Sequence, residues 1–199
     1  MREDGHLEYD IISSLLGAVG VVLRPQAKRP VRMLFLPRQD ISPRERILSA
    51  FPEARPLSGK RGETGVRIEA FLAGEAVRFS IDELDFEGIG EFERRVLLAD
   101  FSIPRGRVMA YGDLAAKAGV PRGARAVGNV MAGNPFPLII PCHRVIRSDG
   151  TLGGFGGGLV MKKALLAMEG VSFDGRGRVL DGHCLRGLRA MQGGFPESS

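Results

Sequence analysis

The sequence predicts an α/β protein in two parts: a mixed α/β first part and a mainly helical second part. Before residue 86, short β-branched or apolar runs alternate with helical patterns, whereas helical patterns dominate from residue 91 to 134. The segment FEGIGEF at residues 86–92 has the composition of a linker. We therefore divide the chain into an N-terminal α/β domain (1–88), a second domain (89–172) and a C-terminal extension (173–199).

In the first part, apolar runs at residues 17–25 and 30–38 flank the polar QAKR and predict a hairpin. Ser42 before Pro43 favours a helix start, so a helix is expected over Ser42–Phe51. Residues 64–81 are expected to form a short helix followed by a strand. No catalytic cluster is visible before residue 90, so the chemistry is expected in the second part.

The second part begins with a helical pattern that stops at Pro104. Two short helical patterns follow at 111–120 and 121–134, and the turn between them contains Gly119 and Pro121, which makes a helix-turn-helix candidate. A further helix runs from Gly158 to Glu169 with Gly170 as its stop. The tail at 171–182 predicts a hairpin, and the final residues 193–199 are expected to fray.

The second helix of the pair has one unusual face. At 100° per residue, Ala124, Val127, Val130 and Met131 fall on the inner side. The outer side is small and basic: Arg122, Arg125, Ala126, Gly128, Asn129 and Ala132. Small residues between arginines let another backbone approach closely. The alternative is a short Ala/Gly-rich core helix with two incidental arginines.

Charge is distributed unevenly along the chain. Residues 1–90 carry 13 Lys+Arg against 14 Asp+Glu, whereas residues 91–199 carry 15 against 9, which together give the net charge of +5. A basic half is typical of a domain that faces a polyanion. No apolar run approaches the roughly 20 residues that a membrane span needs, and the N-terminus is too acidic and polar for a signal peptide. We expect an intracellular, cytoplasmic protein without membrane contact.

Cys142 is the candidate nucleophile. A thiol needs a cation, a base or a dipole nearby to become thiolate, and His143 and Arg144 follow it directly. Glu169, in the last turn of its helix, faces the negative end of the helix dipole and needs a partner. It either orients His143 in a Cys-His-Glu relay or bends out to solvent. The pairs Cys142-His143 and His183-Cys184 lack the usual spacing of metal ligands, so no metal is expected.

The second part closely resembles the O6-alkylguanine-DNA alkyltransferases over about residues 90–171. The PCHRV pentapeptide at Cys142, the upstream RAVG and NP, and the downstream LL..EG occur in the same order and spacing. The first half resembles the family only in length and coarse α/β pattern. The resemblance implies a ribonuclease H-like N-terminal domain, a winged helix-turn-helix domain, and a monomeric, cofactor-free, single-turnover repair protein. Its partner would be double-stranded DNA containing O6-alkylguanine, with O4-alkylthymine as a second candidate substrate.

The resemblance also implies roles for individual residues. Cys142 would accept the alkyl group, His143 would be the base acting through water, Glu169 would hold the imidazole, and Asn134 would brace the turn before Cys142. Arg125 would fill the space of a base flipped through the minor groove, and Tyr111 would push the phosphate. The remaining DNA contacts would be Arg122, Ala126 and Gly128. The substrate pocket would be walled by segments 137–140 and 152–155, with Pro137, Val145, Leu152, Phe155 and Gly156 as its residues.

Phe155 departs from the family, which commonly has a tyrosine there. The missing hydroxyl would weaken stabilisation of the leaving guanine by roughly 1 kcal/mol. An alternative reading is therefore a non-catalytic sensor of alkylated DNA or a DNA-binding regulator, although alkyltransferase-like sensors lack the cysteine that this chain retains. A cysteine hydrolase is a third reading, which the helix-turn-helix and the basic half disfavour.

Overall fold

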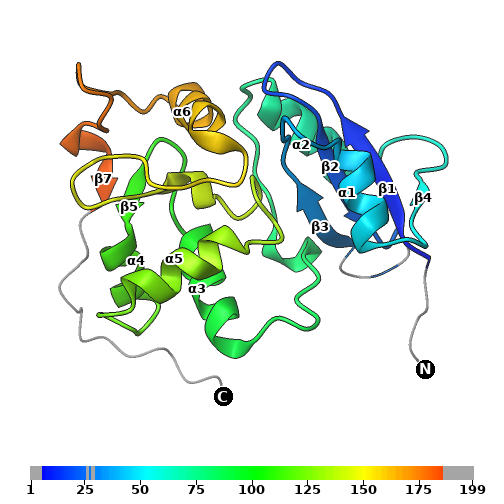
Figure 1. Ribbon diagram of the computed structural model, residues 1–199, viewed down its shortest axis with the longest axis horizontal. Coiled ribbons are helices and arrows are strands. Elements are labelled where there is room, and N and C mark those ends of the chain that lie inside the picture. Colours follow the sequence, from blue (N-terminus) through cyan, green and yellow to red (C-terminus); the bar gives the residue numbers. More distant parts are fainter. Residues whose placement is uncertain (1–5, 26, 28–29, 186–199) are drawn as a thin grey trace.

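A four-stranded sheet forms the centre of the N-terminal half (Figure 1). The computed structural model describes residues 6–25, 27 and 30–185. The strands are β1 (Glu8–Ile12), β2 (Val19–Leu23), β3 (Val31–Phe35) and β4 (Arg55–Pro56), in the order β3-β2-β1-β4. The predicted hairpin is confirmed as the antiparallel pair β2 and β3. Strands β1 and β4 were not predicted, and β4 pairs parallel with β1.

Helices α1 (Pro43–Ala50) and α2 (Glu63–Leu72) cover opposite faces of this sheet. Helix α1 begins where expected, because the Ser42 hydroxyl accepts the N–H of Glu45 at 3.2 Å and the Glu45 carboxylate accepts the N–H of Ser42 at 3.0 Å. Every residue of β2 is buried, since α1 packs on one face and α2 with the second half packs on the other.

The strand expected after α2 is wrong. Residues 75–80 have no regular structure, and a short 3-10 turn, η1 (Ile81–Glu83), follows them. Val77 and Phe79 pack against the core as the chain crosses toward the second half. The free edge of β3 is met instead by a bridge between Val31 and Leu84. These apolar residues are therefore packed against the core without forming a strand.

The second half contains four helices among the described residues: α3 (Glu91–Phe101), α4 (Tyr111–Lys117), α5 (Ala124–Ala132) and α6 (Gly158–Met168). Helices α4 and α5 pack on each other and on α3, and Gly119 lies in the turn between them with φ of 81°. Ala124 was placed on the inner side but is exposed, because α5 begins only there. None of the described helices is long and apolar enough to cross a membrane.

The C-terminal extension packs against this half. Phe173 and Val179 form an antiparallel bridge, which confirms the predicted hairpin. Strand β7 (Cys184–Leu185) then pairs parallel with β5 (Val108–Ala110), which also pairs with β6 (Val145–Ile146). The expected fraying at 193–199 falls outside the described residues, which end at 185 in this extension. The extension therefore adds an edge strand to the small sheet beside Cys142.

One carboxyl group lies inside the apolar core. Asp100 occupies the inner face of α3 together with Val96 and Leu97, and it has no exposed surface. Neither of its side-chain oxygens has a hydrogen-bond partner among the described residues. Burial raises the pKa of Asp100 to about 8, against the opposing influence of Arg144 and Lys162.

The Asp100→Asn variant should therefore change how stability depends on pH. Below the ordinary carboxyl pKa of 3.8, both folded and unfolded chains bind the proton and Asp100 costs no ionisation energy. As the pH rises to 8, only the unfolded chain releases it, which costs the native protein on the order of 5 kcal/mol. The free energy of unfolding in urea should fall less between pH 4 and pH 8 for Asp100→Asn than for the native protein. Asp82→Asn, at an exposed carboxylate, is the control, and equal losses in all three proteins would contradict the assignment.

Candidate active site

Cys142 follows a tightly braced loop. The Asn134 amide donates to the carbonyl of Ile140 at 3.0 Å, and its oxygen accepts the N–H of Phe136 at 2.9 Å. Leu138, inside this loop, is buried and has φ of 74°, a strained value for a residue with a side chain. Asn134 thus holds the turn before Cys142, at the place where the resemblance predicted a brace.

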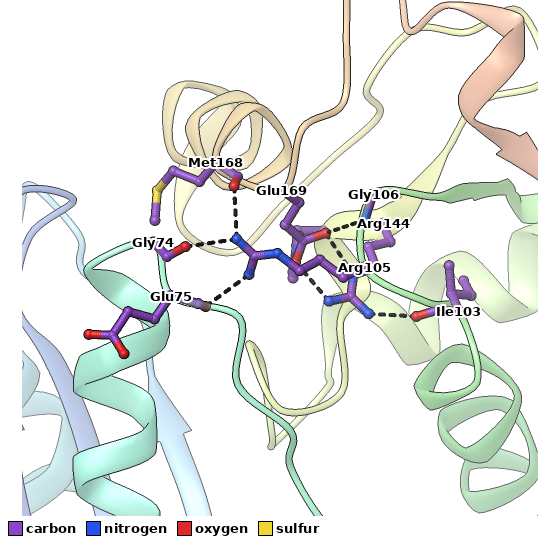
Figure 2. Close-up of polar contacts among 9 residues, drawn as sticks. Gly74, Glu75, Ile103, Arg105, Gly106, Arg144, Met168 and Glu169 are labelled. Carbon is purple, nitrogen blue, oxygen red and sulfur yellow. Dashed lines mark hydrogen bonds and ion pairs between the residues drawn. The ribbon is translucent and has the colours of Figure 1, made fainter.

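Glu169 reaches Arg144 from the end of α6 (Figure 2), and it also contacts His143. Gly170 adopts φ of 86° and ends the helix, so Glu169 caps it. Its Oε1 lies 3.0 Å from Nε2 of His143, and the Arg144 guanidinium donates to both carboxylate oxygens at 2.7 and 2.9 Å. The Glu169 side chain is 1% exposed. Of the two alternatives, the structure therefore contains the buried pair and not the solvated carboxylate.

The charges of this group follow from its surroundings. Burial alone would raise the pKa of Glu169, but the hydrogen bonds and charges of His143 and Arg144 outweigh it and hold the pKa at about 2. Burial lowers the pKa of His143 below its usual value, although Glu169 opposes the shift. At neutral pH Glu169 is an anion and His143 is a neutral imidazole.

The tautomer of His143 decides which atom can accept a proton. An anionic Glu169 accepts only, so we assign the imidazole hydrogen to Nε2. Nδ1 is then the basic nitrogen, and it is buried without a hydrogen-bond partner among the described residues. The ring is held further by Phe71 and Phe155, whose centroids lie 6.0 and 6.4 Å away. Nδ1 is available to take a proton at neutral pH.

Cys142 is a neutral thiol at rest. It is 6% exposed. Burial raises its pKa to about 12, the charge of Asp100 adds to the shift, and the Asn134 side chain and Lys162 oppose it. Formation of a thiolate therefore needs a base, because the surroundings of Cys142 favour the protonated thiol.

A cavity of about 320 Å³ opens beside Cys142. Its walls come from α5, from the start of α4 and from the loop before α6. The lining residues are Tyr111, Gly128, Met131, Ala132, Cys142, Gly154, Phe155 and Gly156. A larger hollow of about 790 Å³ lies at the C-terminal extension, but none of the site residues expected from the sequence lines it. The smaller cavity is the one that contains the chemistry.

Some of the residues expected in the substrate pocket line this cavity, and others do not. Phe155 and Gly156 line the cavity, whereas Pro137, Val145 and Leu152 do not. Pro137 and Val145 are buried in the braced loop and in β6, and Leu152 packs with the cluster around Val108. Their apolar character reflects the core and not the cavity wall.

Two of the residues expected to contact DNA, Arg125 and Ala126, lie exposed on α5, and Arg122 lies exposed in the turn before it. Gly128 of the same helix lies partly buried at the cavity. Tyr111, at the start of α4, packs against the loop, because a Cβ at Gly153 would lie 3.0 Å from its ring. Helix α5 thus supplies both exposed residues and part of the cavity wall.

Sequence reasoning named Arg144 beside Cys142 but missed its pairing with Glu169, and it missed Asp100 and Lys162 altogether. Arg144 forms the ion pair with Glu169, Asp100 lies buried nearby, and Lys162 is fully buried with Nζ donating to the carbonyls of Val145 and Gly154 at 2.6 and 3.2 Å. A signal for Lys162 existed, since it lies three and four residues before the buried Leu165 and Leu166 on one helix face. No three His, Cys, Asp or Glu side chains of the described chain gather as a metal site would need.

Comparison with known proteins places this geometry in context. Residues 91–171 match the family described as "6-O-methylguanine DNA methyltransferase, DNA binding domain". A methylated-DNA–protein-cysteine methyltransferase of Mycolicibacterium paratuberculosis is 38% identical over 163 residues, covering 82% of this chain and 92% of the relative. Its namesake in Methanothermobacter thermautotrophicus is 51% identical over 109 residues, which is 55% of this chain and 61% of that protein.

A solved structure agrees with this likeness. The crystal structure of Mycobacterium tuberculosis OGT in complex with DNA matches with a TM-score of 0.68 and 33% identity, covering 81% of this chain and 92% of that one. The mixed α/β fold with its sheets and helices is therefore shared across nearly the whole of that protein. Since sequence and fold agree over most of the length, the chain belongs to the methylated-DNA–protein-cysteine methyltransferase family.

Proposed function

We propose that the protein repairs DNA by moving an alkyl group from O6-alkylguanine in duplex DNA irreversibly to its own Cys142. One observation carries this proposal: Cys142 lines a cavity and is followed in the chain by a neutral histidine that a buried carboxylate holds by its far nitrogen. Cysteine, base and orienting carboxylate are the parts that a thiol nucleophile requires. O4-alkylthymine is a second candidate substrate.

The proposed chemistry uses the assigned nitrogen of His143. Through a bridging water, Nδ1 accepts the proton of the Cys142 thiol, and Glu169 stabilises the imidazolium that forms. The thiolate sulfur attacks the alkyl carbon, a sulfur–carbon bond forms and the carbon–O6 bond breaks. The electron pair stays on the guanine, which takes a proton to become the normal base. The thioether has no further leaving group, so each molecule reacts once.

The proposed route for the base runs past α5. Chemistry on a stacked base requires its extrusion. Arg125 on α5 and Arg122 in the turn before it would contact the DNA. The Arg125 side chain would fill the vacated stack, and Tyr111 would face the displaced phosphate. The solved structure of M. tuberculosis OGT in complex with DNA supports DNA as the partner. We further propose that α4 and α5 belong to a winged helix-turn-helix domain, that the first half is ribonuclease H-like, and that the protein is an intracellular monomer.

Alkyl transfer should be visible as a covalent change on Cys142. After incubation with a duplex containing O6-methylguanine, peptide mass spectrometry should find one added methyl group on the Cys142 peptide and none in Cys142→Ala. Tight binding of the lesion duplex without any mass gain would instead favour the non-catalytic sensor, to which the missing hydroxyl of Phe155 would contribute.

The Glu169→Gln variant should transfer the methyl group about 10- to 100-fold more slowly. Glutamine can still accept the Nε2 hydrogen bond, but it has no charge to stabilise the imidazolium. Single-turnover rates at saturating duplex, measured after the folded fraction is verified by circular dichroism, test this. Glu63→Gln removes a carboxylate that is 84% exposed and pairs with Arg67 on α2, and it should react at the native rate. Equal rates for both variants would contradict the relay.

Replacing Arg125 with alanine should weaken duplex binding and reduce the slope of log affinity against log salt by about one. Arg125 is exposed on α5, on the face that the proposal turns toward the DNA. Arg55→Ala is the matched control, because Arg55 is exposed on β4 in the other half. An unchanged salt slope for Arg125→Ala would argue against this face as the binding surface.

A further inference from the structure

Arg105 joins the ends of two helices that belong to different halves of the chain (Figure 2). Its Nη2 donates to the carbonyls of Gly74 at 2.9 Å and Met168 at 2.8 Å, and its Nη1 donates to the carbonyl of Glu75 at 3.1 Å. Gly74 and Glu75 follow α2, and Met168 is the last residue of α6. Helix C-termini carry partial negative charge, so the guanidinium stabilises two ends that would otherwise repel each other.

The Arg105 contacts affect both Glu169 and His143. Met168 immediately precedes Glu169, so holding the Met168 carbonyl fixes the end of α6 from which the Glu169 carboxylate projects. The Phe71 ring of α2 lies 6.0 Å from the Arg105 guanidinium and 6.0 Å from the His143 imidazole, and it is 3% exposed. The N-terminal half therefore helps to enclose the histidine as well as to hold its partner.

The braced loop before Cys142 receives a second contact from the same half. The N–H of Leu34 in β3 donates to the carbonyl of Pro135 at 2.8 Å, and the rings of Phe86 and Phe136 pack at 5.3 Å. Two separate elements of the first half thus touch the two segments that supply Cys142 and Glu169. The first half does more than cover apolar surface.

We propose that Arg105 is a positioning residue for alkyl transfer, which holds the end of α2 against the end of α6 and so keeps Glu169 on His143. The inference rests on the proposed function. It assigns the N-terminal half a part in the reaction, although none of its described residues lines the cavity beside Cys142. Arg105 lies on the loop between α3 and β5, away from α5, so it should affect the rate of transfer and not DNA affinity.

The test compares Arg105→Ala, Arg105→Lys and Arg105→Gln with the native protein. At saturating O6-methylguanine duplex, Arg105→Ala should react about tenfold more slowly, because small misplacements of catalytic groups cost rate steeply. Its duplex Kd should be unchanged. Arg105→Lys, which keeps the charge, should recover more of the rate than Arg105→Gln. Arg67→Ala is the matched control, because Arg67 on α2 bonds only to Glu63 and Glu83 among the described residues and should react at the native rate.

A titration of the imidazole separates positioning from general stability. Glu169 raises the pKa of His143 against the effect of burial, so a displaced Glu169 should move the titration of His143 to lower pH. Nitrogen NMR of labelled histidine follows this in the free protein, without DNA. If native protein transfers no methyl group, the proposed function fails, but the titration still tests Arg105. A native rate and an unmoved His143 titration in Arg105→Ala, or a rate loss matched by Arg67→Ala, would overturn the inference.

Discussion

The buried carboxylate of Glu169 is the constraint around which the site is organised. A charge with 1% exposure is costly unless it is paired and hydrogen-bonded. Arg144 satisfies both oxygens, and His143 adds a third contact. Because Arg144 and His143 directly follow Cys142, satisfying Glu169 also fixes the turn that carries the thiol. Stability and reactivity therefore depend on the same contacts.

A neutral thiol beside a neutral base has a physical advantage for a protein that reacts once. Burial holds the pKa of Cys142 at about 12 and lowers that of His143, so the resting pair carries no charge. Thiolates are the forms that react with oxidants and other electrophiles. A thiol that is deprotonated only when a substrate fills the cavity is protected until then. The strained Leu138 turn, held by Asn134, braces the chain directly before Cys142.

The two halves are connected by more than their linker. Arg105 binds carbonyls from both halves, and Leu34 in β3 bonds to the loop before Cys142. The Leu34 contact joins two backbone groups, whereas the Arg105 contacts join a side-chain guanidinium to backbone carbonyls. Helix α2 ends at Leu72 with Ala73 as its cap, and the carbonyls of Gly74 and Glu75, which follow it, accept from Arg105.

The sequence by itself determined the helical elements and the β2–β3 hairpin, and it named His143 and Glu169 as candidate partners in a relay with Cys142. Ser42 with Pro43 and Gly170 act through local backbone preferences, which are legible in one segment. The sequence left open whether Glu169 orients His143 or bends out to solvent, and the tertiary structure contains the buried pair. Only the tertiary structure decided which apolar residues line the cavity. Val145 and Leu152 are as apolar as Phe155, and burial in the core or at the pocket leaves the same pattern in the sequence.

Arg105, Phe71 and Asp100 were also beyond the sequence, and Lys162 was marked only by its helix face. Phe71 and Arg105 lie 34 positions apart in the chain and meet only after the two halves pack. Charged residues are expected on the surface, so residue type alone predicts exposure for Lys162 and Asp100, which are buried. Local propensity determined the elements, whereas long-range contacts and desolvation determined the site.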